Sequence, residues 1–238
     1  MTGALGGRGP TIIIVLWVES VIACITCALR VHTRTAISKA KFSWDDGLSV
    51  ASGVVLVGAA ATGTWATTVG YGRATEEVGA LDPSLASNAL LARIMSQTFM
   101  IVGMATSKAS VAAFLLRIVA VPWHKFTLWF TMLSLATLCL IINILNFVQC
   151  IPPRKTWERT IEGHCWLDIT PPSLTLGIYC TIVDFGLALF PWVVVWGLNM
   201  PKKDKISIGS ALSLGVLAGI AGAIRTSEIP SLGYGDQL

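Results

Sequence analysis

Six apolar runs in the sequence are each long enough to cross the hydrocarbon core of a bilayer, which takes about 20 helical residues. The runs lack the alternation of apolar and polar residues that strands of a membrane barrel show. A spanning segment must also satisfy its own backbone hydrogen bonds, so helices are predicted. The predicted membrane helices are Thr11–Val31, Asp46–Val69, Leu90–Ile118, Phe126–Val148, Ser173–Leu198 and Ile206–Glu228.

Charged residues are too few for a water-facing surface of this size. They make up 13% of the 238 residues, against 54% hydrophobic residues, whereas a soluble domain usually carries about 25% charged residues. The sequence therefore predicts an all-α, polytopic transmembrane helical bundle over residues 11–228. Short outer tails are predicted at residues 1–10 and 229–238, and the lipid bilayer is the first expected partner.

Basic residues between the runs predict the orientation of the bundle. Nine Lys and Arg residues lie at the ends of the first, third and fifth runs or in the loops after them, whereas five lie on the opposite side together with most of the acids. The nine are Arg30, Arg34, Lys39, Lys41, Arg117, Lys125, Lys202, Lys203 and Lys205. Because cytoplasmic loops carry the excess of Lys and Arg, the N-terminus is predicted outside. Six helices would return the C-terminus to the outside.

Several function classes lack a signal in the sequence. The basic residues form short clusters rather than one stripe, so nucleic acid is not an expected partner. His32, His124 and His164 fall in predicted loops or near helix ends and form no metal cluster. Neither a metal site nor a cofactor is therefore predicted.

Three charged residues lie well away from the ends of predicted membrane helices: Glu19, Lys108 and Asp184. Such residues are costly in lipid and usually face a cavity or a partner. Lys108 could pair with Asp46 at the inner end of the second helix, with Asp184 or with Glu19. An ion pair that fixes packing is one interpretation. The other is a ligand-binding, proton-transfer or catalytic role for at least one acid.

Further polar and small residues mark the fourth and sixth predicted helices. Asn143 and Asn146 add polar groups to the fourth, and Arg225 lies near the outer end of the sixth, where its side chain can snorkel toward water. Small residues in the sixth recur four apart, which lets two helices approach closely in lipid. These pairs are Gly215 with Gly219 and Ala218 with Gly222.

Cys150 and Cys165 flank the predicted outer loop after the fourth helix. On an oxidising side of the membrane they can form a disulfide. Closing a loop of this length would stabilise the fold by about 3 kcal/mol in the chain-entropy model. Two free thiols are the alternative. Cys24 and Cys27 are spaced as CxxC inside an apolar run and are interpreted as packing residues.

Spaced fragments of the chain resemble the fungal rhodopsin-domain family of integral membrane proteins. That family includes surface-sensing, receptor-like proteins and members encoded in satratoxin-type toxin gene clusters. The fragments are WDDG at Trp44–Gly47, GYGR at Gly70–Arg73, KASVAAFLLRI at Lys108–Ile118, QCIPPRKTW at Gln149–Trp157, TIVDFGLALFPW at Thr181–Trp192, Lys205, and AIR at Ala223–Arg225.

The resemblance implies a seven-helix fold with the N-terminus outside and a bridge between Cys150 and Cys165. The chain departs from the family pattern because it stops at Leu238, where a seventh helix and a cytoplasmic tail would be expected. The resemblance favours a receptor-like sensor of a small or apolar ligand in the plasma membrane or an endomembrane. A cytoplasmic signalling partner would then be the second protein involved.

Two other functions stay open from the sequence. A membrane enzyme of fungal secondary metabolism could enclose an apolar substrate taken from lipid. Asp184 or Glu19 would then serve as a general acid for a cyclisation or isomerisation. A transporter is the third hypothesis, although no inverted repeat supports it.

Overall fold

The computed structural model describes residues 9–37, 43–70, 83–119, 121–158, 160–195, 219–220 and 222–223. Nearly all of these residues are helical, and their only sheet is a short two-stranded ladder. The elements in chain order are α1 (Gly9–His32), a π-helical turn (Thr33–Ile37), α2 (Trp44–Val69), α4 (Pro83–Ile118), α5 (Pro122–Val148), β1 (Cys150–Ile151), a 3₁₀ helix (Pro153–Thr156), β2 (His164–Cys165) and α6 (Thr170–Val195).

Five helices among the described residues are long and apolar enough to span a membrane. They correspond to the first five predicted runs and confirm the predicted all-α membrane bundle. Within the sixth predicted run, Ile206–Glu228, the structure describes only Gly219, Ile220, Gly222 and Ala223, which are helical. The rest of that run, Arg225 included, lies outside the described residues, as does the predicted tail 229–238.

The helix of the third span begins seven residues before the predicted apolar run. The sequence predicts a start at Leu90, but α4 begins at Pro83 and is 36 residues long, or about 54 Å at 1.5 Å per residue. Hydropathy reports where the chain becomes apolar, whereas the helix begins at a proline, whose fixed φ suits the first helical position. The same reason moves the start of α5 from the predicted Phe126 to Pro122.

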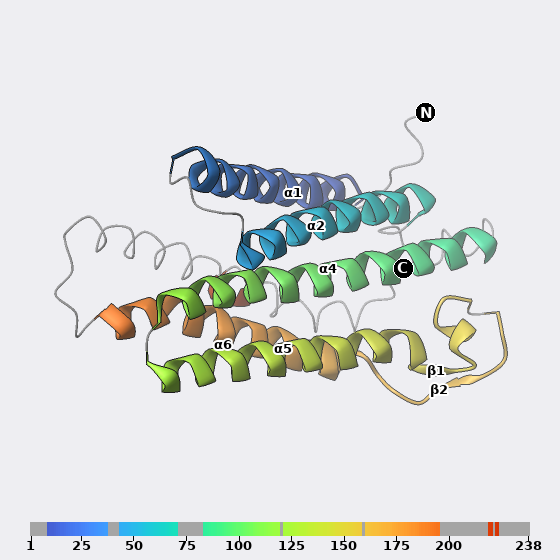
Figure 1. Ribbon diagram of the computed structural model, residues 1–238. Helices are drawn as coiled ribbons and strands as arrows, with labels where there is room; N and C mark the ends of the chain where they lie inside the picture. Colours follow the sequence, from blue (N-terminus) through green and yellow to red (C-terminus); the bar gives the residue numbers. More distant parts are fainter. Residues whose placement is uncertain are drawn as a thin grey trace.

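The helices lie side by side, and α4 occupies the centre of the arrangement (Figure 1). It packs most extensively on α2, and it also contacts α5 and α6. Helix α1 lies at the edge, where it contacts α2, and Gly9 and Ser20 are its buried residues. The central helix is therefore the element through which the two sides of the bundle are joined.

Small residues allow α1, α2 and α4 to approach closely. Ala59 and Ala60 on α2 are fully buried, and Ser96 on α4 donates a hydrogen bond to the backbone oxygen of Ala59 at 3.0 Å. A Cβ added at Gly63 would meet the Leu16 side chain of α1 at 2.5 Å. Close backbone approach of this kind is the usual way to pack helices in lipid.

The main apolar core lies between α4, α5 and α6. The buried residues of α5 recur at three- and four-residue spacing, which places them on one helix face. The core consists of Ile101, Ala112, Leu115, Val119, Leu128, Leu135, Cys139, Ile142, Leu176, Cys180, Val183 and Leu187.

Large apolar side chains cover the outside of the bundle as well. On α5 alone, Phe130 is 64% exposed and Leu140 is 61% exposed. An apolar surface this extensive would be a liability in water, whereas lipid solvates it. The exposed apolar surface, together with the five spans, identifies an integral membrane protein.

The loop between α5 and α6 is closed by the predicted disulfide. Cys150 and Cys165 are bonded to each other and face each other in the antiparallel pair β1–β2. Trp166 connects the loop to the end of α5, because its Nε1–H donates a hydrogen bond to the backbone oxygen of Val148 at 3.0 Å. A Cβ at Gly163 would lie 2.3 Å from the backbone oxygen of Ile151, so only glycine fits there.

Candidate functional site

A buried ion pair joins α4 to α6 in the interior of the bundle. The ammonium group of Lys108 donates a hydrogen bond to Oδ1 of Asp184 and a second one, at 3.3 Å, to the backbone oxygen of Cys180. The Lys108 side chain is 9% exposed and that of Asp184 is 22% exposed. Of the three partners proposed for Lys108 from the sequence, Asp184 is therefore the one that the structure selects.

The pair lies far from both ends of its helices. Lys108 precedes the end of α4 at Ile118 by ten residues, and Asp184 precedes the end of α6 at Val195 by eleven. At 1.5 Å per residue, both lie about 15 Å from those ends. A single charge at such depth costs about 3 kcal/mol on insertion scales. Pairing offsets this cost, because the two charges together are neutral.

A crevice of about 140 Å³ adjoins the pair. Lys108 and three alanines form its α4 wall, and its α5 wall includes Trp129 and Leu133, which are 53% and 59% exposed. The crevice therefore opens on the side of the bundle that faces lipid. Its lining residues are Ala105, Lys108, Ala109, Ala112, Trp129, Thr131, Met132, Leu133, Leu135, Ala136, Val183 and Leu187.

The described part of the sixth predicted run packs against α6 beside Asp184. A Cβ added at Gly219 would meet the ring of Phe185 at 2.9 Å, and one added at Gly222 would lie 3.7 Å from Oδ2 of Asp184. The two glycines thus allow this segment to approach the carboxylate closely. Of the four small residues predicted to allow close approach, Gly219 and Gly222 lie against α6, whereas Gly215 and Ala218 lie outside the described residues.

Asp46 does not pair with Lys108, contrary to one of the predicted alternatives. It lies in the first turn of α2, where Oδ2 accepts a hydrogen bond from the backbone N–H of Ser43 at 3.3 Å and Oδ1 lies 3.6 Å from Nε of Arg30. A carboxylate at a helix N-terminus accepts hydrogen bonds from free N–H groups, and its negative charge interacts favourably with the positive end of the helix dipole. Capping and the contact with Arg30 hold the Asp46 carboxylate at the start of α2.

The neighbouring Asp45 completes a charged cluster at this helix end. Its carboxylate lies 3.1 Å from Nη2 of Arg30 on α1 and 4.0 Å from Nη1 of Arg117 on α4. Its backbone oxygen accepts a hydrogen bond from Ser110 of α4 at 2.8 Å. The guanidinium of Arg30 also stacks over the ring of Phe114, 5.5 Å from its centroid. This inner cluster, Arg30–Asp45–Asp46–Arg117, joins α1, α2 and α4.

Sequence reasoning missed the inner cluster. Arg30 counted only as a loop charge, and Asp45 only as part of the WDDG fragment. Adjacent acids in the first turn of a membrane helix were a signal that could have found it, because buried acids at that position need a basic partner. Basic residues near the ends of the neighbouring helices were the natural candidates.

The remaining predicted site residues do not join the Lys108–Asp184 pair. Glu19 is exposed on α1 and makes no ion pair among the described residues. Asn146 is 4% exposed and continues the buried face of α5. Within the described chain, Oδ1 of Asn143 and Nδ2 of Asn146 are buried without a hydrogen-bond partner. Arg225 lies outside the described residues.

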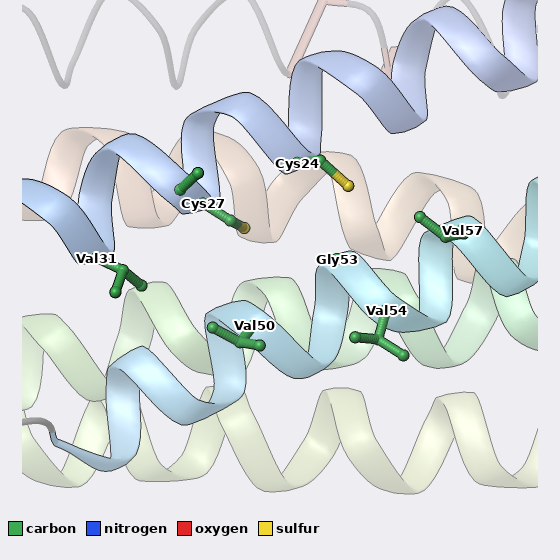
Figure 2. A pocket seen from close by; sticks show the side chains of 8 residues that line it. Cys24, Cys27, Val31, Val50, Gly53, Val54 and Val57 are labelled. Atoms are coloured by element: carbon green, nitrogen blue, oxygen red, sulfur yellow. The ribbon is translucent and has the colours of Figure 1, made fainter.

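The CxxC cysteines line a separate apolar groove between α1 and α2. The groove measures about 470 Å³, and its walls include Cys24, Cys27, Val50 and Val54 (Figure 2). Sγ of Cys27 lies 3.3 Å from the backbone oxygen of Ser49. In the described part of the chain, no group of three or more His, Cys, Asp or Glu side chains could hold a metal ion.

Comparison with known proteins supports the same class. Residues 29–235 match the model of the fungal rhodopsin domain. Over 81 residues, or 34% of this chain, the sequence is 30% identical to a SAT4 family membrane protein of Emericella nidulans, and the match spans 21% of that relative. No solved structure matches the chain. Because the family match covers most of the sequence, the chain belongs to the fungal rhodopsin domain family.

Proposed function

We propose that this protein is a receptor-like membrane sensor that binds a small apolar ligand in the crevice between α4 and α5. The observation that carries the proposal is that Lys108 both lines the crevice and holds Asp184 on α6. A ligand in the crevice would therefore contact one member of a charge pair that joins two membrane helices. Ligand binding and the packing of α4 against α6 would be coupled through that pair.

The inner cluster provides a route from the crevice to the predicted cytoplasmic side. Helix α4 carries Lys108 and, nine residues further on, Arg117, which contacts Asp45 of α2. A shift of α4 on ligand binding would change the contacts of Arg117 at the helix end. A cytoplasmic signalling partner could bind differently after that change, because the Arg117 side chain is more than half exposed and accessible to it.

Acid catalysis by Asp184 receives less support from the geometry. A general acid must reach the substrate that it protonates, whereas Asp184 does not line the crevice and its Oδ1 is held by Lys108. Glu19, the second candidate acid, is exposed on the edge helix α1 and does not line the crevice. The sensor hypothesis therefore explains the Lys108–Asp184 ion pair better than the enzyme hypothesis does.

The test is a comparison of the source organism with and without the gene. We expect an altered response to surface or nutrient cues, with an unchanged set of metabolites, because a sensor makes no product. Loss of one metabolite with build-up of a defined precursor would contradict the sensor and indicate an enzyme. In that case, microsomes carrying the Asp184→Asn variant would show whether Asp184 takes part in the reaction.

A further inference from the structure

The ammonium group of Lys108 has more hydrogen-bonding capacity than its neighbours use. A lysine ammonium carries three N–H donors, and two acceptors contact it, the carboxylate of Asp184 and the backbone oxygen of Cys180. One donor is therefore unused within the described structure. Both acceptors are on α6, so the tetrahedral geometry of the ammonium directs the third N–H away from them. A buried donor without a partner is costly, and Lys108 lines the crevice.

The crevice limits the size of the group that it can accept. Its volume of about 140 Å³ is close to that of an engineered apolar cavity of about 150 Å³ that binds benzene. The small side chains of Ala105, Ala109 and Ala112 form the α4 wall, and the exposed Ala136 lies on the side open to lipid. The crevice therefore suits a flat apolar group about as large as a benzene ring, arriving through the membrane.

Charge balance limits the polar group of the ligand. Lys108 and Asp184 already neutralise each other, so an anionic ligand would bring an uncompensated charge into the membrane interior. A cationic ligand would compete with Lys108 for Asp184 and leave the ammonium unpaired. A neutral oxygen acceptor satisfies the spare N–H and adds no charge.

We propose that the crevice between α4 and α5 binds a neutral aromatic or similarly compact apolar compound through one carbonyl or hydroxyl oxygen, which accepts the spare N–H of Lys108. This inference rests on the proposed sensor function and adds the chemical class of the ligand. A hydrogen bond to a charged donor changes affinity by about tenfold or more. An isosteric compound without the oxygen should bind correspondingly more weakly.

The experiment measures binding of 4-fluoroacetophenone to the full chain in lipid nanodiscs by ¹⁹F NMR, with empty nanodiscs as the reference for partition into lipid. The matched probe is 4-fluoro-α-methylstyrene, which has a methylene group in place of the carbonyl oxygen. The third probe, 4-fluorobenzoate, is anionic. We expect the ketone to bind about tenfold more tightly than the alkene and the benzoate to show no saturable binding. Equal affinities for ketone and alkene, or saturable binding of benzoate, would overturn the proposal.

Two single variants and one double variant locate the binding. Ala136→Leu should abolish binding of both neutral probes by filling the crevice, whereas Ala61→Leu, the same change at an exposed position of α2 outside the crevice, should leave both affinities unchanged. Lys108→Met combined with Asp184→Asn removes the donor without leaving an unpaired charge. It should lower ketone affinity to that of the alkene. If Ala136→Leu binds the ketone as the native protein does, the site is not this crevice.

Failure of this inference is distinguishable from failure of the sensor. Probe binding is measured on the purified protein and needs no cellular response. Selective ketone binding together with a normal cue response in cells lacking the gene would leave the site standing and overturn the sensor. An altered cue response without selective ketone binding would support the sensor and overturn the proposed ligand class.

Discussion

Two charged clusters hold α4 to its neighbours, and they differ in how exposed their basic residues are. The inner cluster, Arg30–Asp45–Asp46–Arg117, lies at helix ends, where Arg30 and Arg117 are 29% and 54% exposed. The Lys108–Asp184 pair lies about 15 Å from the ends of its helices, and the Lys108 side chain is 9% exposed. The acids of the inner cluster are buried, but its arginines extend to water, whereas Lys108 of the interior pair does not.

The difference in exposure of the basic residues separates two uses of charge. At the helix ends, Asp46 also caps α2 and the arginines reach water, so the inner cluster fixes helix ends at small cost. In the interior, two well-packed apolar side chains would hold α4 to α6 as firmly as an ion pair does. The interior pair therefore requires another explanation, and the crevice beside Lys108 provides one.

The largest effect is expected from removing one charge of the interior pair. Lys108→Met leaves Asp184 as an uncompensated charge in the bundle and should lower the free energy of unfolding by about 3–5 kcal/mol. Asp184→Asn should do the same for Lys108. Unfolding of the purified protein in mixed detergent micelles measures both variants.

The double variant, Lys108→Met with Asp184→Asn, is the control for this prediction. It removes both charges, so we expect it to recover most of the stability that either single variant loses. Additive losses in the double variant would mean that the two residues act independently.

A smaller effect is expected at the helix ends. Asp45→Asn removes the charge that Arg30 and Arg117 share, but Arg30 keeps Asp46 at 3.6 Å. The free energy of unfolding should fall by about 1.5–3 kcal/mol, the range for hydrogen bonds to charged groups. The same unfolding assay compares this variant with Lys108→Met. A larger loss for Asp45→Asn than for Lys108→Met would contradict a ranking by the exposure of the basic partner.

A change at Arg117 should lower the free energy of unfolding less than the change at Asp45 does. Its side chain is 54% exposed and its nitrogen lies 4.0 Å from Asp45, and exposed ion pairs contribute about 0–1 kcal/mol. Arg117→Gln should therefore change stability by less than about 1 kcal/mol. The change should shrink further in 1 M salt, which screens exposed charges. A loss that persists at high salt would show that the contact is more buried than its exposure indicates.

The smallest effect is expected at Asp168, a fully exposed acid in the loop before α6. The backbone N–H of Thr170 donates to Oδ1 of Asp168 at 2.9 Å and lowers the pKa of this carboxyl below its usual range. A lowered pKa in the folded state stabilises the fold above the unfolded pKa of about 3.9. That contribution is lost as the pH falls through the folded pKa.

Asp168→Asn should therefore lose slightly less stability than the native protein when the pH falls from 5 to 3. Unfolding midpoints at the two pH values measure the difference, and all other carboxyl groups are common to both proteins. Identical losses would mean that the hydrogen bond from Thr170 does not affect folding stability.

The spans were predictable because hydropathy over about 20 residues depends on composition alone. The start of α4 at Pro83 was not, since its first turns are polar and small and carry no hydropathy signal. The sequence narrowed the partner of Lys108 to three acids, Asp46, Asp184 and Glu19, without ranking them. Choosing among them requires the rotation of each helix about its axis, which only the packing of α4 against α6 determines. The disulfide was predictable from two cysteines flanking one loop.

The cue response of cells carrying the double variant tests the central claim most directly. Cells in which Lys108→Met and Asp184→Asn replace the native residues would be compared with native cells at equal membrane abundance. If the pair serves sensing rather than stability, the variant protein remains folded in the membrane and the response is lost. A normal response from the double variant would contradict the account and reduce the pair to a packing contact.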